Sequence, residues 1–289
     1  MPARSFVTRF APSPTGYLHL GHAYSALVAA RAARDAGGAC LLRIEDIDKG
    51  RCKPEYEAAI LEDLSWLGLS WPSPVRRQSD HFSDYKAALT RLIDKGVVYR
   101  CFKTRKEVAD AIASAPHAPP AGPEGPVYRG GPLPADEENA LIERGAPFAW
   151  RLSIDRAREA LGARFSTLAF TTESLQGEAA KTFRAAPEKF GDAVIARKDA
   201  GASYHLASVH DDALQGVSHV IRGEDLAEAA HLHTLLQALL DAPHPVYRTH
   251  KLITDETGKR LAKRDKAVTL RALRAGGASP GDIRKQLGL

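Results

Sequence analysis

The chain reads Arg9-Phe10-Ala11-Pro12-Ser13-Pro14-Thr15-Gly16-Tyr17-Leu18-His19-Leu20-Gly21-His22 close to its amino terminus. Residues 5–10 are typical of a buried strand, and residues 22–36 predict a helix that ends at Gly37-Gly38. A strand, a glycine-containing turn and a helix in this order indicate the opening of a nucleotide-binding βαβ unit. The stretch therefore predicts an α/β fold with a ligand near the first turn of the helix.

Two histidines, His19 and His22, stand three residues apart at the predicted start of this helix. At this spacing their imidazoles share a face and can both donate hydrogen bonds to phosphate oxygens. Gly21 lacks a Cβ, which would let an adenine ring lie close to the backbone. The N–H groups and the positive dipole end of a helix favour polyphosphate as well. The alternative is a surface turn that happens to contain two histidines. Such a turn would not need the particular residues of the whole stretch from Arg9 to His22, which counts against it.

Strands alternate with helices through the first hundred residues. Residues 39–44 predict a second strand, and Pro54 begins a helix with apolar residues at helical spacing. A further amphipathic helix is expected over residues 83–95, with Gly96 behind it. This alternation implies a mostly parallel sheet that binds ligands at the carboxyl ends of its strands.

The second half of the chain is less regular. Pro and Gly are dense between residues 116 and 134, which indicates a loop or a small inserted subdomain. Strands are expected over residues 149–154 and 217–222, a hairpin over 192–209, and a leucine-faced helix over 226–240. We divide the chain into a first half of the nucleotide-binding domain (1–100), an inserted subdomain (101–190), a second half (191–245), and a loop with a short basic helical tail (246–289).

Composition excludes several classes of protein. The 289 residues can bury a sizeable core, and no run approaches the roughly 20 apolar residues of a membrane span. The amino terminus has no apolar signal-peptide segment, and Cys40, Cys52 and Cys101 lack the number and spacing of a disulfide framework. We therefore expect a cytoplasmic protein with no membrane partner, and a monomer.

Positive charge is concentrated near the carboxyl end. Residues 259–289 hold nine Lys and Arg against two Asp, whereas the formal net charge of the whole chain is +5. Such a stretch alone is typical of a solvated face. Beside a phosphate-binding loop it favours an RNA backbone as the partner.

The stretch at residues 9–22 resembles the HIGH signature of class I aminoacyl-tRNA synthetases, and Arg260-Leu261-Ala262-Lys263-Arg264 resembles their KMSKS signature. The string RFAPSPTGYLHLGH is similar to the glutamyl/glutaminyl branch. Further similar blocks follow in the expected order: Arg43-Ile44-Glu45-Asp46-Ile47-Asp48, Ser203-Tyr204-His205-Leu206-Ala207, Asp211-Asp212 and Val220-Ile221-Arg222-Gly223-Glu224-Asp225-Leu226. The resemblance implies the Rossmann-like parallel sheet of a class I catalytic domain, with an inserted acceptor-type subdomain and a short helical carboxyl-terminal segment.

A glutamate pocket follows from this resemblance and from charge. Glutamate offers two carboxylates and one ammonium, so a selective pocket needs two cations and one anion, and Arg9, Arg222 and Glu45 fit. The positions that match the family's glutamate-binding set are Arg9, Ala11, Ser13, Glu45, Tyr204 and Arg222. Which arginine holds which carboxylate stays open. The alternatives are a surface ion pair of Glu45 with Arg43, and a salt bridge of Arg222 with Glu224 or Asp225.

The reaction implied is attack of the glutamate α-carboxylate on the α-phosphorus of ATP, giving glutamyl-adenylate and pyrophosphate. Catalysis of this kind consists mainly of positioning and charge stabilisation. The resemblance implies His19, His22 and Lys263 as catalytic residues, with Mg²⁺ bridging the phosphates. The ATP-binding residues it implies are His19, Gly21, His22, Arg260, Leu261 and Lys263. Ala262 stands where the family usually has Ser, and a basic solvated turn is the alternative for this segment.

The chain departs from the family at a zinc site. Many glutamyl-type relatives hold zinc with a Cys-x-Cys pair followed by Tyr-x-x-x-Cys, whereas this chain keeps only Cys101 and Tyr128. Lys103 stands in place of the second Cys, and His117 is the only other candidate nearby. Because structural zinc needs four ligands, we expect no metal in this region.

The short segment after the KMSKS-like loop bears on which molecule accepts the activated glutamate. Only residues 266–289 follow the KMSKS-like loop, so the chain looks like the short paralogues that attach glutamate to queuosine in the anticodon of tRNA(Asp). A short enzyme that charges tRNA(Glu) is the first alternative. A HIGH-type adenylating ligase acting on a small molecule is the second, and a non-catalytic tRNA-binding module is the third.

Overall fold

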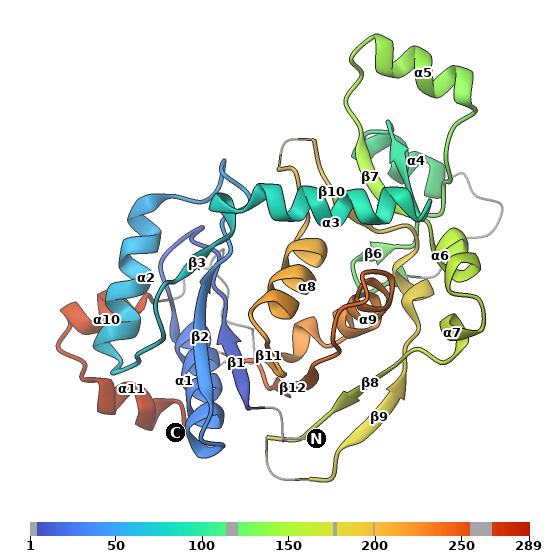
Figure 1. Cartoon of the computed structure of the whole chain (residues 1–289). Helices are drawn as coiled ribbons and strands as arrows, with labels where there is room; N and C mark the ends of the chain where they lie inside the picture. Colours follow the sequence, from blue (N-terminus) through green and yellow to red (C-terminus); the bar gives the residue numbers. More distant parts are fainter. Residues whose placement is uncertain (1–4, 114–120, 176–177, 199, 255–267) are drawn as a thin grey trace.

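Strand β1 (Val7–Phe10) leads into helix α1 (Leu20–Asp35), as predicted, although the helix begins after His19, which is its N-cap. Gly37 follows the helix with a φ of 62°, a conformation that favours glycine, and its N–H bonds the carbonyl of Arg34. The computed structural model describes residues 5–113, 121–175, 178–198, 200–254 and 268–289. In Figure 1, β1 and α1 lie together beside β2 in the lower left part of the molecule.

Two sheets meet edge to edge beside β1. The first has the order β1-β2-β3, and its strands are parallel. The second has the order β11-β12-β8-β9, with β8 and β9 antiparallel. The N–H of Ser218, just before β11, donates to the carbonyl of Val7 at 2.9 Å and joins the two sheets. The chain order therefore reverses between β1 and β11, and such a switch point is where doubly wound sheets bind ligands.

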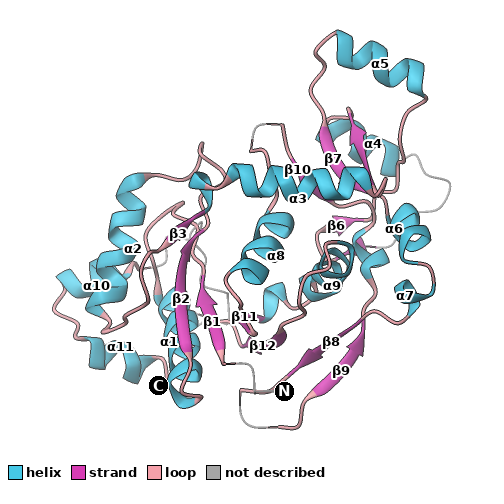
Figure 2. Cartoon of the chain, in the orientation of Figure 1, coloured by secondary structure: helices cyan, strands magenta, loops and turns pink. Residues whose placement is uncertain are grey.

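The remaining strands of these sheets are β2 (Ala39–Ile44), β3 (Arg76–Arg77), β8 (Ala169–Thr172), β9 (Lys181–Arg184), β11 (His219–Gly223) and β12 (Val246–His250). The remaining helices are α2 (Pro54–Trp66), α3 (Phe82–Asp94), α4 (Arg105–Ala113), α5 (Ala135–Glu143), α6 (Ile154–Leu161), α7 (Ala163–Ser166), α8 (Tyr204–Leu214), α9 (Ala229–Leu239), α10 (Leu270–Ala275) and α11 (Pro280–Gln286). Figure 2 shows this mixture of strands and helices, and α10 with α11 confirms the predicted helical tail. None of the described helices combines the length and the hydropathy that a membrane span requires.

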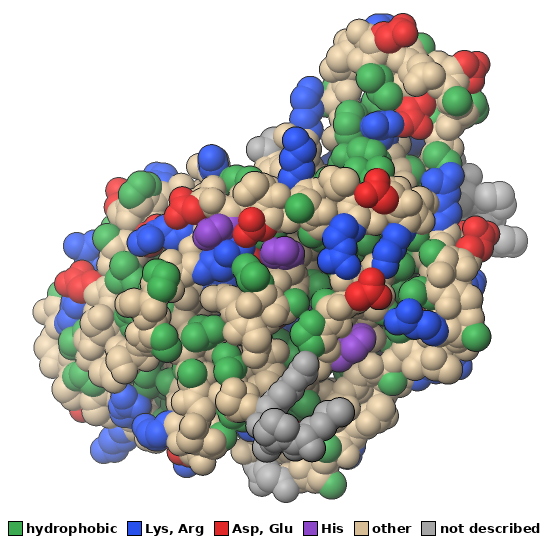
Figure 3. All heavy atoms as spheres, viewed as in Figure 1, with side chains coloured by type: hydrophobic (Ala, Val, Ile, Leu, Met, Phe, Trp, Pro, Cys, Tyr) green, Lys and Arg blue, Asp and Glu red, His purple; other side chains and the backbone are tan. Residues whose placement is uncertain are grey.

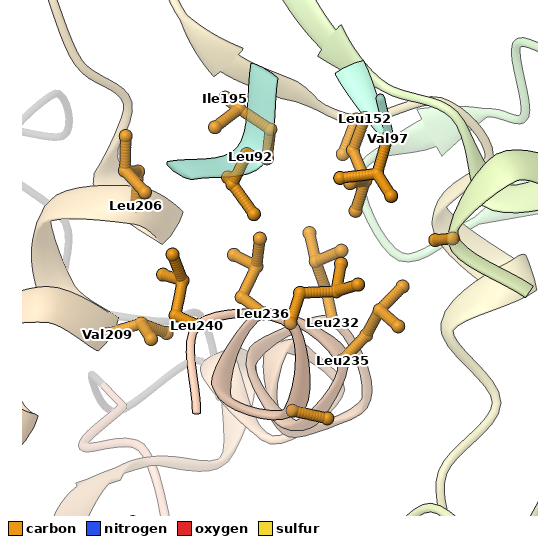
Figure 4. Close-up of a cluster of buried hydrophobic side chains, with 14 of the residues drawn as sticks. Leu92, Val97, Leu152, Ile195, Leu206, Val209, Leu232, Leu235, Leu236 and Leu240 are labelled. Atoms are coloured by element: carbon orange, nitrogen blue, oxygen red, sulfur yellow. The ribbon is translucent and has the colours of Figure 1, made fainter. Parts of the chain in front are cut away.

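The largest apolar core lies between α9 and the strands and helices around it. Leu232, Leu235 and Leu236 of α9 point towards Leu92, Leu152 and Ile195, among other buried side chains (Figure 4). Burying a leucine or isoleucine side chain contributes roughly 1.5–3 kcal/mol, so this helix face anchors the second half of the domain. The predicted leucine-rich face is confirmed.

The inserted region forms its own antiparallel sheet in the order β10-β7-β4, from β4 (Val98–Cys101), β7 (Ala149–Leu152) and β10 (Val194–Ala196). A small hairpin of β5 (Ala121–Gly122) and β6 (Gly125–Pro126) belongs to the same region, and α5 protrudes from it (Figure 1). Strand β4 begins before residue 101 and β10 lies beyond residue 190, so this sheet crosses the boundaries of 101–190. Those boundaries remain a prediction.

The hairpin predicted over residues 192–209 is wrong. Strand β10 ends at Ala196, and α8 begins at Tyr204 with the Ser203 hydroxyl accepting a hydrogen bond from the N–H of Leu206. Helix α8 is buried on several sides, including its polar residues Asp211 and Asp212. A helix buried in this way has no single apolar stripe, so its sequence resembles strand alternation.

Candidate active site

A cavity of about 390 Å³ opens at the switch point, beside the carboxyl ends of β1, β2, β11 and β12. Every described residue that the sequence assigns to glutamate or ATP lines it: Arg9, Ala11, Ser13, His19, Gly21, His22, Glu45, Tyr204 and Arg222. Arg260, Leu261 and Lys263 lie outside the described residues. The nine residues come from four segments far apart in the chain, so the fold brings them together, while their individual roles remain predictions.

The two histidines form a reciprocal cap on α1. Nδ1 of His19 accepts from the N–H of Gly21 at 3.1 Å, and Nδ1 of His22 accepts from the N–H of His19 at 3.3 Å. Because each Nδ1 is an acceptor, the proton of each neutral ring lies on Nε2. The ring centroids are 3.9 Å apart. A Cβ on Gly21 would lie 3.0 Å from the His19 ring, so glycine also leaves room for that ring.

A buried network of charges holds Arg9 on one wall of the cavity. Asp212 Oδ1 accepts from Nε of Arg9 at 2.9 Å and from Nη1 of Arg43 at 2.7 Å. Burial alone would raise the pKa of Asp212, but Arg9 and Arg43 outweigh it and lower that pKa. Asp212 therefore stays ionised and orients the guanidinium of Arg9. The sequence offered no way to find this pair, because its partners are separated by 203 positions.

Glu45 pairs with Arg43, but not on the surface. Nη2 of Arg43 donates to Oε1 of Glu45 at 3.0 Å, and Arg43 is completely buried. Burial raises the pKa of Glu45, against the opposing effect of Arg43 and Arg9. The ion pair of the alternative interpretation is present, yet it lies inside the protein and presents Glu45 to the cavity. An additional cation in the cavity would oppose this rise in the pKa of Glu45.

Arg222 differs from Arg9 in that its buried guanidinium has no hydrogen-bond partner among the described residues. It is 4% exposed, and none of its three guanidinium nitrogens has a hydrogen-bond partner among the described residues. Its guanidinium carbon lies 4.8 Å from the ring centroid of Tyr247, which offers only a cation–π contact. The salt bridge to Glu224 or Asp225 considered from the sequence is not found in this part of the chain. A buried arginine cannot neutralise itself by losing a proton, so it needs an anion.

Several residues that line the cavity were not identified from the sequence. His250, at the end of β12, lines the cavity, and its Nε2 lies 2.8 Å from the hydroxyl of Ser25. Since its Nδ1 lies 3.0 Å from the carbonyl of Lys251 and must donate there, Nε2 accepts from Ser25. Leu252 and Ile253 follow along the same wall. No motif contains these residues, and only the end position of a parallel strand would have indicated them.

The inserted region contains no evident metal site within the described residues. No group of three or more His, Cys, Asp or Glu with suitable geometry occurs there or elsewhere in the described chain. Cys101 and Tyr128 instead belong to a small apolar cluster with Tyr99, whose hydroxyl donates to Asp192 at 2.9 Å. His117 lies outside the described residues. The expected absence of zinc therefore remains a prediction.

Comparison with known proteins identifies the family. The profile described as "tRNA synthetases class I (E and Q), catalytic domain" matches residues 5–288. The chain belongs to this family. It is 48% identical to a protein of Rhodobacter capsulatus named glutamyl-Q tRNA(Asp) synthetase, over 98% of this chain and 100% of that protein. It is 37% identical to the glutamate–tRNA ligase of Aquifex aeolicus, over 94% of this chain but 54% of that enzyme.

Solved structures of synthetases support the fold assignment. A glutamate tRNA ligase from Elizabethkingia meningosepticum, in complex with its amino acid, superposes with a TM-score of 0.68 at 27% identity. That similarity covers 91% of this chain and 52% of the ligase. Methionyl-tRNA synthetase of Mycobacterium tuberculosis shares the fold alone, with a TM-score of 0.55 at 12% identity. The expected Rossmann-like fold and the enzyme class, a ligase of the class I synthetases, are confirmed.

Proposed function

We propose that this chain activates glutamate with ATP and transfers it to the queuosine base in the anticodon of tRNA(Asp). The observation that carries glutamate activation is the buried Arg222, which has no hydrogen-bond partner among the described residues and lines a cavity with Glu45. An amino acid with a carboxylate and an ammonium supplies an anion for Arg222 and a second cation for Glu45, which already pairs with Arg43. The similarity to the Rhodobacter capsulatus protein named glutamyl-Q tRNA(Asp) synthetase supports the proposed transfer to queuosine.

Glutamate binding uses the charges of the cavity. Arg9 and Arg222 take the two carboxylates, and Glu45 takes the ammonium, with each charged hydrogen bond contributing about 1.5–3 kcal/mol. Ser13 and Tyr204 supply hydroxyls that orient the ligand. Replacement of one carboxylate by an amide leaves a buried guanidinium underpaired, so glutamine is rejected.

ATP binding uses the start of α1. The Nε2–H groups of His19 and His22 donate to phosphate oxygens, and the helix dipole favours the same charge. Lys263 neutralises the departing pyrophosphate. Mg²⁺ binds hard oxygen ligands, and since the wall around the histidines offers donors, the phosphates themselves would hold it; there it would neutralise phosphate charge. In-line attack of the glutamate α-carboxylate on the α-phosphorus then needs positioning and no covalent enzyme intermediate.

The acceptor distinguishes this function from its main rival. Labelled glutamate should be transferred to tRNA(Asp) that carries queuosine, and not to unmodified tRNA(Asp) or to tRNA(Glu). Periodate oxidation of the queuosine diol should abolish transfer, whereas enzymatic removal of the 3′-terminal adenosine should leave it intact.

Charging of tRNA(Glu) is the second candidate, because the chain is also 37% identical to a glutamate–tRNA ligase. Transfer to tRNA(Glu) that depends on its 3′-terminal adenosine would establish this candidate and remove the queuosine proposal. Glutamate-independent consumption of ATP with either RNA would contradict both.

A further inference from the structure

His205 has no role in the reaction proposed above, although it follows Tyr204 directly in the block of residues 203–207. It is the second residue of α8 and is 6% exposed. Histidine side chains occupy little of the face shown in Figure 3, and His233 of α9 is buried as well, with 3% exposed. Buried imidazole nitrogens need hydrogen-bond partners, so the contacts of these two rings show what holds them.

Two hydrogen bonds join these histidines to the inserted region. Nδ1 of His205 lies 3.2 Å from Nε2 of His233, and Nε2 of His205 lies 2.8 Å from Oε1 of Glu124. Glu124 stands in the turn between β5 and β6, 81 positions before His205. The hairpin, α8 and α9 lie near one another in Figure 1. We call the three side chains the histidine network.

The hairpin that carries Glu124 packs closely against the body of the protein. A Cβ on Gly122 of β5 would collide with the carbonyl oxygen of Lys189 in the 3₁₀ turn η2 (Pro187–Phe190). The first turn of α8 contains no acidic residue of its own, and Glu124 brings a carboxylate to it. The positive end of the helix dipole favours that charge. The fold therefore holds Glu124 against α8 from a distant part of the chain.

The chemistry of the network determines where its protons lie. An ionised carboxylate only accepts, so Nε2 of His205 donates to Glu124, and this hydrogen bond lowers the pKa of Glu124. In the neutral ring of His205, Nδ1 then accepts from Nε2 of His233. Burial lowers the pKa of His233 well below its ordinary value, with the charge of Arg222 adding to the effect. His233 is therefore neutral, with its proton on Nε2.

His233 lies behind the wall of the glutamate cavity. Its ring centroid is 5.7 Å from that of Tyr204 and 5.3 Å from that of His205. Among charged groups, Arg222 has the largest effect on the pKa of His233. Tyr204 and Arg222 line the cavity, and neither histidine is among the described residues that do. The network can thus affect a bound ligand only through the position of Tyr204 and Arg222.

We propose that Glu124 is a positioning residue for the glutamate pocket, which acts through His205 and His233 on Tyr204 and Arg222. Residues that orient the groups touching a substrate determine how precisely a site is formed before binding. Without this carboxylate, His205 can carry its proton on either nitrogen. The hydrogen bond to His233 can then run in either direction, and the ring behind Tyr204 loses its single orientation. The inference rests on the proposed function only in taking glutamate as the ligand.

The first test compares Glu124→Ala with the matched control Glu228→Ala. Both carboxylates are about half exposed, at 58% and 50%, and Glu228 lies 3.7 Å from Nε2 of His231, also on α9. In glutamate-dependent exchange of pyrophosphate into ATP, Glu124→Ala should raise the Michaelis constant for glutamate about fivefold. The constant for ATP and the maximal rate should stay within twofold, because only ground-state binding of glutamate is affected. Glu228→Ala should change none of these values.

The second test reads the tautomer of His233 without any substrate. In protein labelled with ¹⁵N in histidine, NMR distinguishes a protonated from an unprotonated ring nitrogen, and loss of a signal in His233→Gln assigns it. The unmodified protein and Glu228→Ala should carry the His233 proton on Nε2 near neutral pH. Glu124→Ala should show both tautomers.

Either of two results would overturn the proposal: an unchanged His233 tautomer in folded Glu124→Ala, or a glutamate Michaelis constant within twofold of the unmodified protein. An equal rise of that constant in Glu228→Ala would do so as well. If the unmodified protein fails to activate glutamate, the proposed function is wrong, and the NMR comparison still decides whether Glu124 sets the state of His233.

Discussion

Two buried arginines flank the active-site cavity, and they differ in their partners. Arg43 is 0% exposed and contacts Asp212, Glu45 and Gln215 at 2.7–3.1 Å. Arg222 is 4% exposed and has no hydrogen-bond partner in the described chain. The charge of Arg43 is balanced within the fold, so that residue is structural. The charge of Arg222 is not balanced in this way among the described residues, which supports its proposed role in holding a substrate carboxylate.

Asp63 shows that an unpartnered buried charge need not mark a ligand site. It is 1% exposed in α2, and neither carboxylate oxygen has a hydrogen-bond partner among the described residues. Burial raises its pKa to about 6, against the effect of Arg274. A carboxyl group can thus lose its charge by binding a proton near neutral pH. Arginine has no such route, and this difference makes Arg222 the stronger sign of a bound anion.

The largest effect is expected for Arg43→Met. Removal of this guanidinium leaves Asp212 and Glu45 buried without compensation, which should lower the free energy of unfolding by about 3–5 kcal/mol. Urea denaturation at pH 7.5 measures this. Arg31→Met removes an exposed arginine paired with Asp35 in α1 and should cost less than about 1 kcal/mol. Equal losses for the two variants would contradict the structural role of Arg43.

A smaller, pH-dependent effect is expected for Asp63→Asn. Because the pKa of Asp63 is higher in the folded than in the unfolded state, the folded state binds more protons, and stability falls as pH rises towards about 6. Asparagine removes this dependence, so the stability gained by the variant should be about 1.4 kcal/mol larger at pH 8 than at pH 5. Asp35→Asn on the surface is the control. The same gain at both pH values would show that Asp63 is ionised throughout.

The smallest effect concerns Glu45 and glutamate binding. Burial raises the pKa of Glu45, and its ionised form is the one that binds the substrate ammonium. The Michaelis constant for glutamate should therefore rise as pH falls through that raised pKa, by at most about tenfold per pH unit. The measurement is glutamate-dependent exchange of pyrophosphate into ATP between pH 5 and pH 8. In Glu45→Gln the Michaelis constant should be higher at pH 8, and this rise on acidification should disappear; if it persists, another group causes it.

The sequence predicts the local parts of this molecule well. Strand β2 begins and ends at the predicted residues 39 and 44, and the Pro54 helix begins where expected, because the signals lie within each segment. The strand-turn-helix order of residues 5–36 also predicts a ligand near the first turn of α1, where the cavity lies. Motif resemblance supplied the candidate residues that line it.

The features that the sequence does not predict depend on contacts between segments that are far apart in the chain. Arg43 meets Asp212 across 169 positions, and no local pattern could have indicated that Asp212 holds both Arg9 and Arg43. The helix that begins at Tyr204 was misassigned because its buried polar residues obscure the helical period. That Arg222 has no hydrogen-bond partner among the described residues is likewise visible only in the folded structure.

Calorimetric titration of the Arg222→Met variant with glutamate tests most directly whether Arg222 holds a carboxylate of glutamate. Glutamate affinity should fall at least about tenfold, since a charged contact contributes about 1.5–3 kcal/mol, often more when bidentate. ATP affinity should stay within twofold. Unfolding should need as much urea as before or more, because the variant removes a buried charge that has no hydrogen-bond partner in the described part of the chain. Retained glutamate affinity in this variant, or a loss of stability as large as that of Arg43→Met, would contradict the account.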